Sequence, residues 1–137
     1  MSKNNNGNKR PKPTKNPDIM ANTRIMGREG MRLIRNMAQG KFNFYTEGHI
    51  FRNKDFVVAT IDEVDKRIME HGIHVNAIRC AYAGSQDPNV LNVLHRDEKA
   101  LEAYSLVRQT LEGIKLTQDT GLLYVLLNKL PNYRYNI

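Results

Sequence analysis

The spacing of apolar and polar residues changes near residue 40. Over residues 18–39, apolar side chains recur every three or four positions, which is the period of an amphipathic helix. The apolar side of this helix consists of Met26, Leu33, Ile34 and Met37. Gly40 ends the pattern and is a typical helix stop. Gly27 and Gly30 each weaken a helix by about 1 kcal/mol relative to alanine, so we expect a break near Gly27 or a helix completed on binding.

After this helix the pattern shortens to alternating runs that are typical of strands. We expect strands over residues 41–46, 49–53 and 56–59, with a turn at residues 47–48. Three short strands in this order predict an antiparallel β-meander. Residues 73–82 favour a fourth strand, and a helix is nearly as well supported there.

Helical signals dominate the rest of the chain. Helices are expected over residues 61–72, 88–94, 97–113 and 120–130. Thr60 and Glu63 form a capping box at the start of the first of these, and Gly72 is expected to end it. Asp87 followed by Pro88 is a helix cap with proline at the first helical position.

These elements predict an α+β fold. It is a small helix-rich domain with a short antiparallel β-meander, preceded by a basic N-terminal tail and the amphipathic helix. The expected division is residues 1–17 for the tail, 18–40 for the helix, 41–131 for the compact domain and 132–137 for a C-terminal tail. A chain of 137 residues and 15.8 kDa has room for one such domain with its own core.

The composition excludes several classes of protein. Cys80 is the one cysteine, so an internal disulfide is ruled out, as are zinc sites of four cysteines or of two cysteines and two histidines. No apolar run approaches the roughly 18 residues of a membrane helix, and the charged, Asn-rich start is not a secretory signal. We expect a cytoplasmic protein, or one within a particle assembled in the cytoplasm.

The positive charge is concentrated at the start of the chain. Residues 1–41 hold ten bases and two acids, a net charge of +8, whereas residues 42–137 have a net charge of −1. The ten bases are Lys3, Lys9, Arg10, Lys12, Lys15, Arg24, Arg28, Arg32, Arg35 and Lys41. Residues 1–17 have three prolines and no apolar side chain beyond Met1, so we expect a disordered or extended tail. This asymmetry indicates a polyanionic partner, nucleic acid first; the alternative is a tail that only confers solubility.

Four arginines of the predicted helix share one side of it. At 100° per residue, Arg24, Arg28, Arg32 and Arg35 fall within about 80° of one another, opposite the apolar side. We call them the arginine face. Like charges on one face repel unless an anion binds, and the planar guanidinium suits phosphate oxygens. We therefore expect contacts with phosphate; the alternative is a solvated face of a docked helix.

Several aromatic residues are candidates for stacking on bases. Tyr45 on the first strand, and Tyr133 and Tyr135 in the C-terminal tail, are expected at the surface, where such rings stack on unpaired bases. For the tail the alternative is a free peptide. Phe42 and Phe44 alternate with Tyr45 and are expected in the core.

Sequence support for catalysis is poor. Neither GxxxxGK[ST] nor GxGxxG occurs, and no serine stands in a GxSxG turn. Cys80 with His71 and His74 offers a thiol–imidazole pair or a set of metal ligands, but a buried, inert cysteine is the expected outcome.

The acidic clusters have structural explanations. Asp62, Glu63 and Asp65 are typical of the first turn of a helix, where acids interact well with the helix dipole. Asp97, near His95, indicates a loop followed by a helix cap. We therefore expect no metal site, no cofactor and no enzymatic activity.

The sequence thus predicts a non-enzymatic, nucleic-acid-associated protein. Its basic tail and arginine face would contact the phosphate backbone of RNA or DNA with low sequence specificity, and its neutral domain would pack on a protein partner or on itself. One alternative is a structural subunit of a virion or other large particle, with the N-terminal arm threaded between neighbours. Others are an inhibitor that docks on an acidic protein and, least favoured, a helix lying on a membrane surface.

Overall fold

In the computed structural model of this protein, residues 17–137 are described, with side chains from Asn22 onward. The α-helices are α1 (Pro17–Ala38), α2 (Phe44–Glu47), α3 (Lys54–Ala81), α4 (Pro88–Thr117) and α5 (Leu123–Lys129). Three short 3-10 helices connect or extend them: η1 (Gly48–Arg52), η2 (Thr120–Leu122) and η3 (Leu130–Tyr133). Residues 17–137 contain no strand, so the fold of this region is all-helical.

The predicted α+β class and its β-meander are therefore wrong. The first two expected strands are replaced by α2 and η1, and the third is the first part of α3. Each short turn presents only one or two apolar side chains to the core, which is too few to show a helical period. Phe42 and Phe44 do pack against the core, but from a loop and from α2 rather than from a strand.

The long helix α3 begins earlier and ends later than predicted. The side-chain oxygen of Asn53 accepts a hydrogen bond from the backbone N–H of Phe56 at 3.2 Å and caps the helix. Thr60, the expected cap, is buried inside the helix, where its hydroxyl donates to the carbonyl of Phe56 at 2.8 Å. Gly72 does not end the helix. The expected fourth strand is its last part, which agrees with the helical alternative.

The next helix, α4, begins where predicted. The side chain of Asp87 accepts a hydrogen bond from the backbone N–H of Asn89 at 2.9 Å, with Pro88 in the first turn. The helix then continues without a break through both helices expected there. The loop expected near Asp97 is absent from it.

Asp97 instead lies between two histidines of α3. His71 Nδ1 is 3.0 Å from Asp97 Oδ1, and His74 Nδ1 is 2.5 Å from Oδ2. The Asp97 residue is only 7% exposed, and the His71 ring stacks on Tyr104 of α4 with centroids 5.7 Å apart. The contact with His71 is a hydrogen bond, whereas Oδ2 has no hydrogen-bond partner among the described residues despite the close approach of His74. A buried carboxylate needs partners, and the two histidine contacts join α3 to α4.

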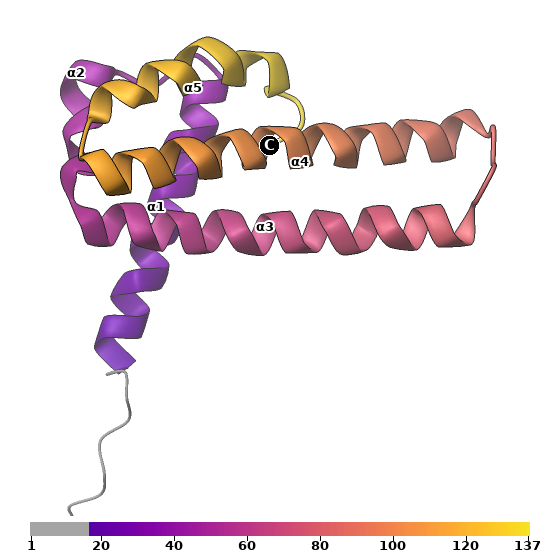
Figure 1. Cartoon of the computed structure of the whole chain (residues 1–137), viewed down its shortest axis with the longest axis horizontal. Coiled ribbons are helices and arrows are strands. Elements are labelled where there is room, and N and C mark those ends of the chain that lie inside the picture. The colour runs from indigo at the N-terminus through magenta and orange to yellow at the C-terminus, as the bar shows by residue number, and fades with distance from the viewer. Residues whose placement is uncertain (1–16) are drawn as a thin grey trace, which may run out of the picture.

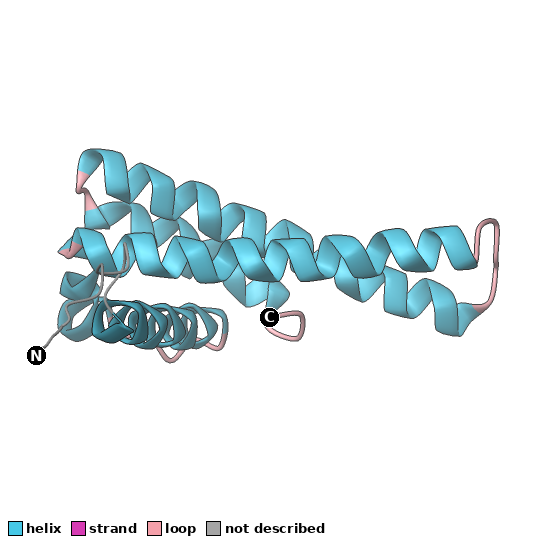
Figure 2. Ribbon diagram, turned by 90° about the horizontal axis from the view of Figure 1, so that it is seen from below, coloured by secondary structure: helices cyan, strands magenta, loops and turns pink. Residues whose placement is uncertain are grey.

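The two long helices form an antiparallel hairpin that dominates the shape of the protein (Figures 1 and 2). α1 and α5 pack on the half of the hairpin near the start of α3, and the other half extends beyond them (Figure 1). The shared core combines Ile34 and Met37 of α1, Val57 and Val64 of α3, Val107 and Leu111 of α4, and Leu123 and Leu126 of α5. The core therefore lies at one end of the hairpin.

α1 crosses α3 at two buried glycines. A Cβ atom on Gly30 would lie 1.9 Å from Thr60 Oγ1, and one on Gly27 would lie 2.9 Å from the carbonyl oxygen of Ala59. No larger side chain fits, so the two helices approach with their backbones nearly in contact. The predicted break near Gly27 is absent, because α1 is one helix through both glycines. The glycines weaken α1 locally and permit its packing.

Gly30→Ala is expected to lower the free energy of unfolding by about 2–4 kcal/mol, because the added methyl group collides with buried Thr60. Asn22→Ala is the control. It is an exposed position of the same helix, so it is expected to change the free energy of unfolding by less than about 1 kcal/mol. Urea unfolding measures both, and equal effects would contradict the close crossing.

Asp97→Ala is expected to lower the free energy of unfolding by about 1–3 kcal/mol, because it removes the buried link from α4 to both histidines. The neighbouring Glu98→Ala breaks only a surface ion pair with Arg79 and is expected to cost less than about 1 kcal/mol. If the free energy of unfolding falls by a similar amount in both variants, the histidine contacts do not hold the hairpin together.

Candidate nucleic-acid interface

The position of α1 is set by its buried side. Leu33, Ile34 and Met37 are buried in the core, and Met26 packs against it from the rim. Met31, which the helical spacing did not place on the apolar side, is buried as well. At 100° per residue Met31 falls only about 20° from Arg24, so the buried side of α1 extends to the edge of the arginine face.

The opposite side of α1 carries the arginine face. Arg24, Arg28 and Arg32 are exposed, and Arg35 is half-buried. Among the side chains of residues 22–137, the structure gives an ion pair to Arg32 but to none of the other three. The positive charge of this face is thus only partly neutralised by the described part of the chain.

Arg32 is held by Glu29 one turn earlier. Its Nε and Nη2 atoms donate to the two carboxylate oxygens at 2.9 and 2.5 Å. This hydrogen bonding lowers the pKa of Glu29 and raises the pKa of Arg32, to which the Glu47 carboxylate adds a smaller contribution. The carboxylate of Glu29 competes with any phosphate for the same guanidinium.

The first half of α1 extends past the hairpin into solvent (Figure 1). It carries Arg24, whereas Arg28 lies at the crossing point between Gly27 and Gly30, and Arg32 and Arg35 lie beyond it. Arginines along a rigid helix keep a fixed spacing, which suits contact with successive phosphates of one backbone.

Of the remaining predicted phosphate contacts, only Lys41 belongs to the described residues. Lys41 is exposed in the loop after α1. Lys3, Lys9, Arg10, Lys12 and Lys15 lie outside the described residues. They remain predictions from the sequence alone.

Tyr45, a predicted stacking residue, belongs to an aromatic cluster. It is 87% exposed and meets Phe44 edge-on, with ring centroids 5.8 Å apart. Phe44 in turn packs on Tyr124 of α5 at 4.6 Å. A hydrogen bond with Tyr45 raises the pKa of the Tyr124 hydroxyl. The sequence analysis missed Tyr124, since nothing in the spacing connects it to a residue so far away in the chain.

The two tyrosines near the C-terminus differ from each other. The hydroxyl of Tyr133 donates to Glu102 at 3.2 Å, and Lys99 stands 5.9 Å from its ring centre, so this residue fastens η3 to α4. Tyr135 is 85% exposed, with the Arg134 guanidinium 5.4 Å from its ring centre. Tyr45 and Tyr135 therefore keep their rings open to solvent, and Tyr133 does not.

Several candidates for catalysis and metal binding are engaged in ion pairs. Cys80 is exposed, so its expected burial is wrong. Asp65 binds Arg108 of α4 at 2.7 Å, and Glu63 faces Lys66 and Arg67. Within residues 17–137, no group of three or more His, Cys, Asp or Glu side chains is arranged to hold a metal ion.

Comparisons of the chain with models of known protein families, with curated proteins and with solved structures gave no match. Among the described helices, none is long and apolar enough to cross a membrane.

Glu29→Gln is expected to tighten binding of the protein to RNA or DNA by about two- to fivefold, because it releases Arg32 for phosphate. Fluorescence anisotropy with a labelled oligonucleotide measures this. Glu70→Gln, an exposed site on α3 with the same change in net charge, is the control and is expected to have less effect. If both variants bind the oligonucleotide more tightly by the same factor, the change in affinity comes from net charge alone and not from the release of Arg32.

Proposed function

We propose that this protein is a non-enzymatic nucleic-acid-binding protein that contacts the phosphate backbone of RNA or DNA. The contacts are made by the arginine face of α1 and by the basic residues that precede it. We place its action in the cytoplasm, or in a particle assembled there, where the exposed thiol of Cys80 stays reduced.

One observation supports this proposal above the others. α1 is fixed by its glycine crossing and its buried side, and in that position it directs four arginines away from the core. Keeping Arg24, Arg28 and Arg35 together without a carboxylate partner in residues 22–137 is electrostatically unfavourable. A polyanion removes that cost and is recognised by arginine with good geometry.

The same observation bears on specificity. Arginines spaced along one helix and lysines in a preceding segment contact backbone oxygens, which are the same at every nucleotide. We therefore expect binding of many sequences with similar affinity and a strong dependence on salt. RNA and DNA share this chemistry, so both are candidate ligands.

The quadruple variant Arg24→Gln, Arg28→Gln, Arg32→Gln and Arg35→Gln tests the proposal. Binding of mixed-sequence RNA and of duplex DNA is measured by anisotropy at several salt concentrations. Loss of these contacts is expected to weaken binding at least about tenfold and to make the slope of log K against log salt shallower by roughly two to four units.

The control is a variant with the same loss of charge elsewhere. Lys66, Arg96, Lys99 and Lys129 are exposed and lie outside α1, and their change to glutamine is expected to alter affinity much less. Both variants should keep the thermal midpoint of the wild type. Equal loss in both would attribute binding to net charge, and unchanged affinity in the arginine variant would remove α1 from the mechanism.

A structural subunit of a larger particle is the second candidate. It is favoured by the half of the hairpin that extends beyond α1 and α5, where Met69 and Ile73 are 66% and 64% exposed. Large apolar side chains exposed together are typical of surfaces covered in an assembly. Native mass spectrometry of the full chain shows whether it occurs in assemblies.

A further inference from the structure

One face of the hairpin has a charge pattern that is complementary to a second copy of the same face. Asp65, Gly72 and Arg79 recur every seven residues along α3, so they share one side of that helix. On α4, Arg108 binds Asp65 and Glu98 binds Arg79, so these residues lie on the same side of the hairpin. We call the surface formed by Asp65, Gly72 and Arg79 of α3 with Glu98, Leu101 and Arg108 of α4 the open face.

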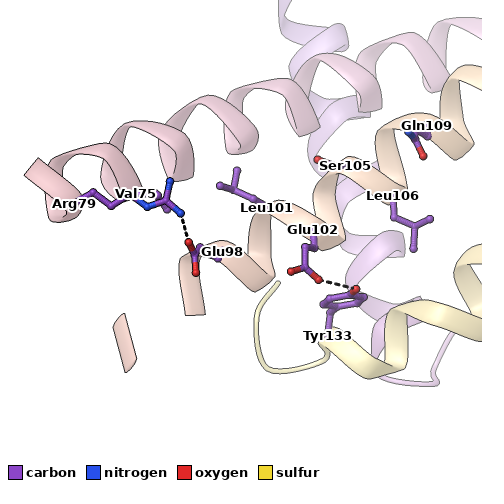
Figure 3. A pocket seen from close by; sticks show the side chains of 9 residues that line it. All are labelled: Val75, Arg79, Glu98, Leu101, Glu102, Ser105, Leu106, Gln109 and Tyr133. Carbon is purple, nitrogen blue, oxygen red and sulfur yellow. Dashed lines mark hydrogen bonds and ion pairs between the residues drawn. The ribbon is translucent and has the colours of Figure 1, made fainter. Parts of the chain in front are cut away.

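The open face is hollow and partly apolar. A groove of about 750 Å³ opens beside the Arg79–Glu98 ion pair, with Val75, Leu101 and Ser105 in its lining (Figure 3). Tyr133 forms its far edge. The groove is open to solvent along this side.

The hairpin is thinly packed next to this groove. In α4 the first buried apolar side chain is Ala100, so the turns before it contribute only Asp97 to the buried set. Two helices alone seldom bury enough apolar surface to be stable. A further pair of helices packed on the open face would bury more apolar surface in this part of the hairpin.

Gly72 is the least explained residue of this surface. It lies midway between Asp65 and Arg79, inside a helix of 28 residues. No atom lies within 4 Å of where its Cβ would be. Gly27 and Gly30 permit a close helix crossing because they lack a Cβ atom, but within the described chain no helix crosses at Gly72.

The charges point to the partner. Along α3 the order is acid then base, Asp65 then Arg79, and across the face on α4 the signs are opposite. When a second copy is laid face to face and antiparallel, Asp65 stands opposite the partner copy's Arg79, and Glu98 stands opposite its Arg108. Each of the four charged residues at the corners of the open face then meets a residue of opposite charge in the second copy. Gly72 lies midway along α3 between Asp65 and Arg79, so the two-fold axis that relates the copies passes beside it.

We propose that a second copy of this chain binds the open face, with the two hairpins antiparallel and their α3 helices crossing at Gly72. The dimer is a four-helix arrangement with a partly apolar centre and four intermolecular ion pairs, which form one cluster at each end. Each arginine joins the carboxylate of its own chain and one from the partner, which its five donors allow. The inference does not depend on nucleic-acid binding.

Two paired reversals test the geometry. Variant one carries Arg79→Glu with Glu98→Arg, and variant two carries Asp65→Arg with Arg108→Asp. Each keeps an ion pair within the chain but places like charges opposite each other in the dimer. Sedimentation equilibrium of the full chain, freed of nucleic acid, is expected to show a reversible wild-type dimer and, for each variant alone, a dissociation constant raised at least about tenfold.

The mixture of the two variants is the decisive sample. In a dimer of one copy of each, all four corners again meet opposite charges, so an equimolar mixture is expected to associate about as tightly as the wild type. Circular dichroism and thermal midpoints close to those of the wild type establish that each variant is folded.

A separate variant tests the centre of the face without changing any corner charge. Gly72→Gln fills the crossing point in a position that is open within one chain, and it is expected to abolish the dimer while the fold persists. The proposal is overturned if the wild type is monomeric at high concentration, if Gly72→Gln dimerises normally, or if the mixture of reversed variants fails to associate.

Discussion

The contact of α1 with α3 at Gly27 and Gly30 determines how the rest of this protein is arranged. Because the backbone of α1 nearly touches the carbonyl of Ala59 and the side chain of Thr60, α1 has little freedom to rotate about its own axis. In the observed rotation its apolar side enters the core and its arginines face solvent. A rotation by one residue, about 100°, would bring a guanidinium toward the core, at a high desolvation cost. The arginine face is thus a consequence of packing.

The interactions that join the two helices of the hairpin change along its length. Near α1 and α5 it is joined by apolar packing, whereas farther out Asp97 and its two histidines take over that role. A polar link specifies the alignment of two helices more narrowly than interchangeable apolar contacts do, and it leaves apolar side chains free to face outward. The protein therefore presents two separate surfaces. One is basic and belongs to α1, and the other is neutral, partly apolar and belongs to the hairpin.

The sequence allowed some elements to be predicted and concealed others, for physical reasons. α1 was predictable because Met26, Leu33, Ile34 and Met37 follow a helical period, and the start of α4 because Asp87 and Pro88 are local signals. The β-meander was wrong because α2 and η1 are too short to display a helical period, so their apolar side chains resembled those of strands. Gly72 and Asp97 misled for a related reason. Each has a local preference for a helix end, yet both lie inside long helices. Contacts distant in sequence hold Asp97 there, whereas no atom lies near the Cβ position of Gly72. The arginine face was predicted from spacing alone, whereas Tyr124 could be connected to Tyr45 only once the fold was known.

The central claim is that the outward side of α1 is the binding surface of this protein. NMR spectra of the full chain, titrated with a short single-stranded RNA at moderate salt, test it most directly. The account predicts that the side-chain Nε signals of Arg24, Arg28, Arg32 and Arg35 shift together with the backbone signals of α1, while those of the outer half of the hairpin stay in place. Shifts confined to the hairpin, or no shifts at RNA concentrations well above that of the protein, would contradict it.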